Sequence, residues 1–152
     1  MSVWNIFRIG ASALNAQRTR LDAISNNIAN AETTHTEAGG PYQRRDVVFT
    51  PDGQKPFEFH INRLRGSTNV TPAGGLKGVK VDGIVLNDEP GPQVYDPTHP
   101  DANEEGFVQY PNVNMVVEMT NMMSATRSYE AGLTVVEAAK RIALKALEIG
   151  RA

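Results

Sequence analysis

The chain has three histidines, His35, His60 and His99, and their spacing decides whether a metal site is expected. They are 25 and 39 residues apart, form no i, i+4 pair, and have no cysteine to join them as ligands. Asp96, His99 and Asp101 could together hold a hard metal ion, but three solvated loop residues are the simpler interpretation. The sequence therefore predicts no metal ion and no cofactor.

Other patterns that could support catalysis are incomplete. The glycine-rich residues 74–78 lack the Gly-Lys-Ser/Thr ending of a phosphate loop and precede an expected strand rather than a helix. No serine lies in a Gly-x-Ser-x-Gly turn, and the absence of cysteine excludes thiolate nucleophiles and disulfides. A carbohydrate-processing site within residues 37–105 is one alternative, yet no carboxylate pair there has a recognisable spacing. We expect a protein that is not an enzyme.

Charge and hydropathy exclude further classes. The net charge is −2 over 152 residues, and residues 33–111 carry seven basic and eleven acidic side chains. No segment has the basic field of a nucleic-acid-binding surface. No run of about 18 apolar residues exists that could span a bilayer, and the N-terminus lacks the apolar core of a cleaved signal. A cytosolic protein is the default, and export without signal cleavage would leave the same pattern.

Helix-breaking residues are concentrated in the middle of the chain. All nine prolines lie between Pro41 and Pro111, and ten of the thirteen glycines lie between Gly39 and Gly106. This distribution predicts an α+β fold with long N- and C-terminal helices paired as a coiled coil and a small β-rich middle. Residues 1–32 and 112–152 would form one discontinuous helical domain, and residues 33–111 the β-rich domain with long loops.

The N-terminal arm has an apolar heptad repeat. Ser2 is a reasonable N-cap. One heptad position holds Phe7, Leu14, Leu21 and Ile28, and the position three residues on holds Gly10, Gln17, Ile24 and Ala31. Gly10 and Gln17 are poor core residues, so the repeat predicts a coiled-coil seam of modest quality. Asn26, Asn27 and Asn30 then interrupt the helical propensity. Two interpretations stay open: the helix end frays into a loop, or the amides fix register across a packed interface.

The middle segment has short alternating runs typical of strands. These runs are Val47–Phe49, Phe57–Ile61, Val79–Leu86 with a bulge expected at Gly83, Val94–Tyr95 and Phe107–Tyr110.

The C-terminal arm has the clearest helical pattern. Asn112 or Asn114 can cap it, and Gly150 is a natural residue to follow its end. One heptad position holds Met115, Met122, Tyr129, Val136 and Ala143, and the position four residues on holds Met119, Thr126, Leu133, Lys140 and Leu147. Small residues form a further stripe at Ala125, Gly132, Ala139 and Ala146.

The two arms carry more apolar surface than one partner helix can cover. Residues 113–149 would extend roughly 55 Å at 1.5 Å per residue, which does not suit a compact small domain. Because a 152-residue chain has no large core to bury such a helix, the missing burial is expected from other subunits. The methionines would tolerate slightly different neighbours around an assembly.

Motifs in both arms resemble those of the flagellar axial proteins, which build the rod and hook. Residues 25–33 (SNNIANAET) are similar to their shared SNNxANAxT signature. A match to the proximal-rod branch is carried by residues 39–45 (GGPYQRR), 47–49 (VVF), 78–81 (GVKV), 111–114 (PNVN) and 118–131 (EMTNMMSATRSYEA). The sequence departs from that branch at Asn114, where Asp is usual, and at Gly132, where Asn is common.

The resemblance implies a structural subunit of the bacterial proximal rod, the periplasmic part of the drive shaft in the basal body. Such proteins pair their terminal helices into an inner tube, leave the cell through the type III export channel without cleavage, and polymerise head-to-tail with other rod subunits and copies of themselves. Contact of the β-rich part with the surrounding rings or peptidoglycan is left open. Before assembly the terminal arms are expected to be disordered.

We expect four residues of the N-terminal arm to pack on five of the C-terminal arm: Leu14, Leu21, Ile24 and Ile28 on Met119, Met122, Tyr129, Leu133 and Val136. Four polar residues are expected to fix the register: Asn26, Asn27, Asn30 and Arg127. The predicted assembly interface is Phe7, Leu14, Leu21, Ile24, Asn26, Asn27, Ile28, Asn30, Met115, Met119, Met122, Met123, Arg127, Tyr129, Leu133, Val136 and Leu147. The alternative is a cytosolic helical-hairpin adaptor or regulator, in which the arms cover only each other.

Overall fold

The computed structural model describes residues 3–52 and 77–150, which form two long helices and two small antiparallel sheets. Helix α1 spans Val3–Ala29 and helix α3 spans Met115–Ile149. Strands β1 (Arg45–Pro51) and β2 (Val79–Leu86) form one sheet, and β3 (Gln93–Tyr95) and β4 (Phe107–Gln109) form the other. This arrangement confirms the α+β class. The expected N-cap Ser2 and the expected strand at Phe57–Ile61 lie outside the described residues.

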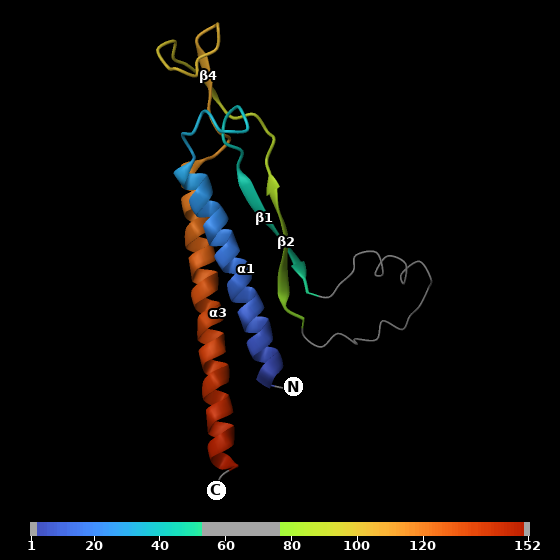
Figure 1. Ribbon diagram of the computed structural model, residues 1–152. Coiled ribbons are helices and arrows are strands. Elements are labelled where there is room, and N and C mark those ends of the chain that lie inside the picture. The colour runs from blue at the N-terminus through green and yellow to red at the C-terminus, as the bar shows by residue number, and fades with distance from the viewer. Residues whose placement is uncertain (1–2, 53–76, 151–152) are drawn as a thin grey trace, which may run out of the picture.

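The two helices lie side by side and run in opposite directions, with both chain termini at the same end (Figure 1). A side chain added at Gly10 would meet Val136, and one added at Gly132 would meet Leu14. Four residues forward on α1 are thus matched by four residues back on α3, as antiparallel helices require. This register places the start of α1 opposite about residue 143 of α3, so the last turns of α3 extend beyond its partner.

Asparagines shape both helix ends on the side of the β strands. Asn114 is the N-cap of α3, because its side chain accepts hydrogen bonds from the backbone of Val116 (3.0 Å) and Val117 (3.2 Å), which confirms one of the two predicted caps. At the end of α1, the Asn30 amide donates to the Asn26 carbonyl at 2.9 Å. At the other end of α3, Gly150 has φ −78°, a right-handed conformation rather than the left-handed one a terminal glycine often supplies.

The β1–β2 hairpin lies along α1 and is fixed to it near both ends. The Ser12 hydroxyl accepts the Val79 N–H at 3.1 Å, and the Asn27 side chain bonds the backbone of Arg45. Ser12 and Asn27 are about 22 Å apart on a helix, and the hairpin between Val79 and the Arg45 level is about 23 Å long. The two lengths match, so the hairpin contacts α1 over its full length.

The β1–β2 sheet contains the expected bulge, and the β3–β4 sheet is compact. The β1–β2 register shifts between Val48, which faces Gly83, and Phe49, which faces Val81; this confirms a bulge beside Gly83. In the other sheet Val108 is fully buried, while Tyr95 and Phe107 make an edge-to-face contact with centroids 5.3 Å apart.

Candidate functional site: a polar junction and an uncovered helix

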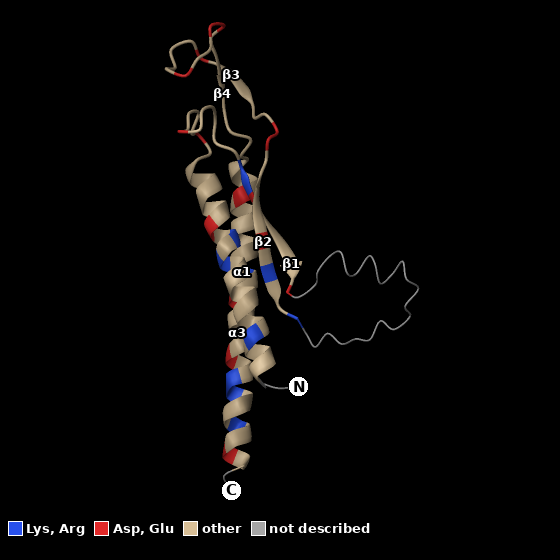
Figure 2. Cartoon of the chain, turned by 45° about the vertical axis from the view of Figure 1, so that its right-hand side comes forward, with Lys and Arg blue, Asp and Glu red and all other residues tan. Residues whose placement is uncertain are grey.

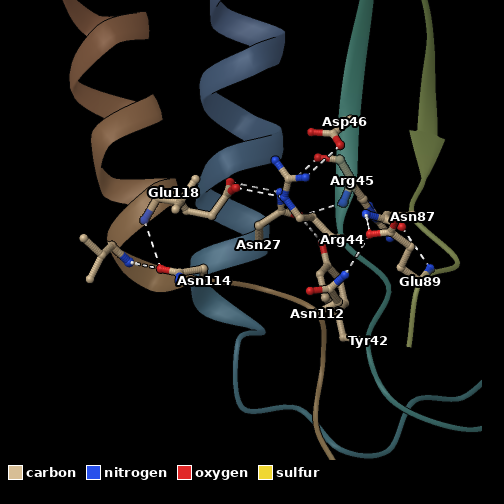
Figure 3. A network of polar contacts seen from close by, with 12 residues as sticks. Asn27, Tyr42, Arg44, Arg45, Asp46, Asn87, Glu89, Asn112, Asn114 and Glu118 are labelled. Atoms are coloured by element: carbon tan, nitrogen blue, oxygen red, sulfur yellow. Dashed lines mark hydrogen bonds and ion pairs between the residues drawn. The ribbon is translucent and has the colours of Figure 1, made fainter. Parts of the chain in front are cut away.

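Three segments far apart in the sequence meet at a buried polar junction, which consists of Asn27, Tyr42, Arg44, Arg45 and Glu118 (Figure 3). Asn27 comes from the last turns of α1, Glu118 from the first turn of α3, and the other three from the start of β1 and the residues before it. Asn27 and Glu118 are 0% and 1% exposed.

The Asn27 amide is fully satisfied within the chain. Its Nδ2 donates to the Arg45 carbonyl at 2.9 Å and to Glu118 Oε2 at 3.2 Å. Its Oδ1 accepts the Arg45 N–H at 2.8 Å and the Tyr42 hydroxyl at 3.0 Å. A primary amide can make four such bonds, and this one makes all four. The Asn27 side chain therefore pairs with both the N–H and the C=O of Arg45, as the backbone of a neighbouring strand would, although Asn27 lies in a helix.

Glu118 is the buried charge of the junction, and it is held by a cation. Arg44 Nε donates to Glu118 Oε1 at 2.9 Å, and the same guanidinium bonds Asp46 Oδ2 at 3.0 Å. The first turn of α3 also favours a carboxylate, since backbone N–H groups point toward it. Burial raises the pKa of the Tyr42 hydroxyl; the Arg45 cation opposes this rise and the Glu118 carboxylate adds to it.

The sequence motifs predicted Asn27 as a residue that fixes register, but not the identity of its partners. The side-chain amides of Asn26 and Asn30 donate to the helix carbonyls of Asp22 and Asn26. For these two asparagines, the interpretation of the segment as the end of a helix therefore holds. Glu118 was missed as an interface residue, because a charged residue in a helix is usually solvated, and its only signal was its place at the start of the motif of residues 118–131.

The seam between α1 and α3 contains about half of the predicted interface residues. Ile24 is buried at 5% exposure. The remaining members are partly buried: Phe7, Leu14, Leu21, Ile28, Met122, Tyr129 and Val136. The residues of α3 that are fully covered are the small Ala125 and Ala139, together with Glu118.

The expectation that Met119 and Leu133 pack on the N-terminal helix is not met in the isolated chain. They are 48% and 44% exposed, while Gly132 and Val136 make the close approaches to α1. The physical reason is that the small-residue stripe lets the two helix backbones approach, which rotates the larger residues to the flank of α3. The other predicted residues that remain exposed are Asn26, Met115, Met123, Arg127 and Leu147.

Charged residues are distributed unevenly along the molecule. Residues 86–110, which include β3 and β4, contain six acidic side chains and no Lys or Arg, and Figure 2 shows them on the loops beyond the helix ends. In these loops Asp96 accepts the Thr98 hydroxyl at 2.6 Å and the Thr98 N–H at 3.0 Å, which lowers the pKa of its carboxyl. Asp101 bonds Thr34 at 2.6 Å, and its N–H donates to His99 Nδ1 at 3.1 Å.

These hydrogen bonds stabilise turns in the loops and do not form a set of metal ligands. Among residues 3–52 and 77–150, no group of three or more histidines or carboxylates is placed to hold a metal ion. None of the helices in this described part is long and apolar enough to cross a membrane.

Comparison with known proteins assigns the class. Residues 7–34 match the family described as "Flagella basal body rod protein", and residues 104–149 match "Flagellar basal body rod FlgEFG protein C-terminal". These two matches include most of α1 and the whole of α3. They place the chain among the flagellar axial proteins of the rod type.

Relatives of the same length identify the branch. The chain is 43% identical to the flagellar basal-body rod protein FlgC of Bacillus subtilis, over 99% of this chain and 100% of the relative. Identity to the FlgC proteins of Borreliella burgdorferi and Salmonella typhimurium is 38% and 37%, with at least 98% of each chain covered. The chain belongs to the FlgC family of flagellar basal-body rod proteins. It is a structural subunit of the rod that assembles with other rod subunits, not an enzyme, and the adaptor alternative is not favoured.

Proposed function

We propose that this chain builds the proximal part of the rod by head-to-tail polymerisation with other rod proteins and with copies of itself. Residues 1–32 and 112–152 would pair as a coiled coil and form the inner tube, with residues 33–111 as a small β-rich domain outside it. The matched four-residue steps of α1 and α3 support this pairing.

The observation that carries the proposal is the uncovered apolar surface of α3. Its exposed large apolar residues, all between 40% and 79% exposed, are Met115, Val116, Val117, Met119, Met123, Leu133, Val135, Ile142, Leu144, Leu147 and Ile149. Soluble monomers seldom leave such a continuous apolar length of helix uncovered. Covering the half-exposed Met119, Met123 and Leu133 alone would contribute about 3 kcal/mol, taking half of the value for full burial of each.

Membership of the family and the layout of the chain support a proposed route to the rod. The subunit would leave the cell uncleaved through the flagellar type III export apparatus and join the rod in the periplasm. The last turns of α3, which extend beyond α1 and lack covering neighbours, would order fully only on joining the assembly. The acidic loops around β3 and β4 lie beyond the helix pair (Figure 2), where they would meet the surrounding rings or peptidoglycan.

A charge placed on the uncovered flank tests the proposal. In a strain that depends on this chain for its rod, Leu133→Lys should abolish motility and rod formation, because a lysine cannot be buried unpaired between subunits. Ser124→Lys is the matched control, since Ser124 is also exposed but lies about 180° around α3 from Leu133. Normal rods, seen by electron microscopy of isolated basal bodies from the Leu133→Lys strain, would refute a buried arm.

A further inference from the structure

The part of α3 that extends beyond α1 has the length of one heptad. In the described register Leu14 faces Gly132, which leaves about seven residues at the end of α3 past the start of α1. Ala146 is one of these residues, and it is exposed. Because both helices carry heptad repeats, an unpaired heptad at the end of one helix raises the question of a second register.

Large residues of α1 would meet small residues of α3 in either register. The apolar stripe of α1 is Phe7, Leu14, Leu21 and Ile28, and the small stripe of α3 is Ala125, Gly132, Ala139 and Ala146. In the described register the first three members of the α1 stripe lie opposite small residues, whereas Ile28 lies at the level of Glu118 and Ala146 has no partner in α1. A shift of α3 by one heptad toward the strands, about 10.5 Å, would give all four members of the α1 stripe a small residue opposite.

The apolar pattern therefore does not select the described register, and the polar junction does (Figure 3). Glu118 binds Asn27 at 3.2 Å and Arg44 at 2.9 Å, and both bonds require the first turn of α3 to lie beside the last turns of α1. The shift would carry Glu118 about 10.5 Å past Asn27. It would separate a buried amide and a buried carboxylate from their partners, and the loss of these bonds opposes the shift.

The contacts of the hairpin do not oppose a movement of α3. The β1–β2 hairpin is bonded to α1 through Ser12 and Asn27, and among the described elements no strand comes within 8 Å of α3 between Cα atoms. Residues 110–114 join β4 to α3 without regular structure, and the first three of them line a cavity of about 640 Å³. Five residues reach up to roughly 17 Å, so this link can follow a movement of about 10.5 Å.

We infer that Asn27, Arg44 and Glu118 form a register latch, which holds α3 one heptad away from the position that its small stripe favours. The latched register leaves the last turns of α3 uncovered. Release of the latch lets the start of α1 cover these turns within the same chain, which closes them to neighbouring subunits. This consequence for assembly rests on the proposed function, whereas the latch is a property of the single chain.

Disulfide formation between introduced cysteines reports the register, because the chain has no cysteine of its own. Leu14→Cys with Gly132→Cys, the Gly132 pair, reports the described register, since a Cβ at Gly132 would lie 3.8 Å from Leu14 Cγ. Leu14→Cys with Ala139→Cys, the Ala139 pair, reports the shifted register, because in the described one it is about 10.5 Å out of register and cannot close. Leu14→Cys with Val135→Cys, the Val135 pair, is the control, because Val135 is 57% exposed and faces α1 in neither register.

The purified full chain is oxidised with copper phenanthroline, and only the Gly132 pair should close while Glu118 is present. With Glu118→Ala, closure of the Ala139 pair should rise by about tenfold or more, because loss of one member of a buried ion pair shifts an equilibrium by at least that factor. Glu118→Gln, which keeps one of the two bonds and disturbs folding less, should give a smaller rise. Asn114→Ala weakens the N-cap of α3 but keeps the latch, so it should give none.

The outcomes separate the latch from the proposed function. Closure of the Ala139 pair that is unchanged in both Glu118 variants overturns the latch and leaves the rod assignment intact. Closure of the Val135 pair as readily as the Ala139 pair also overturns it, because the helices then separate instead of shifting.

A rescue experiment tests the consequence for assembly. In a strain that depends on this chain for its rod, Glu118→Ala should reduce swimming, and adding the Gly132 pair should restore it, because disulfides form in the periplasm. Adding the Ala139 pair should not restore swimming. Equal swimming with the two pairs overturns the consequence for assembly, and failure of even the unsubstituted chain to build rods counts against the proposed function itself.

Discussion

Replacing Glu118 with alanine is expected to detach the start of β1 from the helix pair. The substitution removes the carboxylate that binds Arg44 Nε at 2.9 Å and Asn27 Nδ2 at 3.2 Å. It leaves one arm of the Asn27 amide unpaired in a position with no solvent contact. The Arg44 guanidinium keeps its bond to Asp46.

The size of the effect follows from the burial of the two charges. Removing one member of a buried ion pair costs about 3–5 kcal/mol of unfolding free energy. The Arg44 side chain is 24% exposed and can be partly hydrated, so the low end, about 3 kcal/mol, is expected. Glu118→Gln keeps one acceptor oxygen, for Arg44 or for Asn27, and turns its NH2 group toward the other donor, so it should cost about 2 kcal/mol, less than Glu118→Ala.

Urea unfolding of the purified chain, followed by far-ultraviolet circular dichroism, measures this difference. With a slope of about 1.5 kcal/mol per molar urea, a loss of 3 kcal/mol moves the midpoint down by about 2 M. The control is Glu130→Ala, an exposed glutamate on the same helix, which should change stability by less than about 0.5 kcal/mol. Equal midpoints for Glu118→Ala and Glu130→Ala would refute the view that the junction holds the hairpin to the helices.

Three further predictions concern single positions. Gly10→Ala should lower the unfolding free energy by about 1 kcal/mol net, because its new Cβ would lie 2.5 Å from Val136 Cγ2. Gly83→Ala should not lower the unfolding free energy, because no atom lies within 4 Å of its new Cβ. Thermal unfolding compares the two variants. Asn114→Ala should cost about 1 kcal/mol through loss of the α3 N-cap, and Asn114→Asp should retain it, with the thermal midpoint as readout; equal losses would contradict the capping role. Because burial raises the pKa of Tyr42 in the folded state, its contribution is present below the unfolded value of about 10 and is lost as pH rises through the folded pKa. Denaturation at pH values of about 9 and 11 should therefore show a smaller pH-dependent loss in Tyr42→Phe than in the unsubstituted chain, and an unchanged loss would refute this assignment.

The order and type of the elements could be predicted because each has a strong local signal. No proline and only three glycines lie outside the middle segment, so the heptad spacing at the two ends predicted two long helices. The strands at β1 and β2 followed from runs of β-branched and aromatic residues, and the bulge from Gly83.

The face by which α3 contacts α1 could not be predicted in the same way. Three neighbouring heptad positions of α3 are apolar or small, so periodicity alone does not choose among them. The choice depends on which pair of surfaces lets the backbones approach, and Gly10 opposite Val136 decides it. Large residues such as Leu133 are left on the flank as a result.

The polar junction could be predicted only in part. Asn27 was marked by its motif, but its partners Tyr42, Arg45 and Glu118 are 15, 18 and 91 residues away from it, and a single sequence gives no sign of contacts at such separations. A charged residue in a helix is usually solvated, so Glu118 would be assigned to the surface without a structure. Burial of this carboxylate depends on the cation that β1 supplies.

A reconstruction by cryo-electron microscopy of intact rods containing this chain tests the central claim most directly. The account predicts that the flank of α3 formed by Met119, Met123 and Leu133, exposed in the single chain, is covered by side chains of neighbouring subunits. A map in which this flank faces solvent, with α1 and α3 contacting only each other, would contradict it.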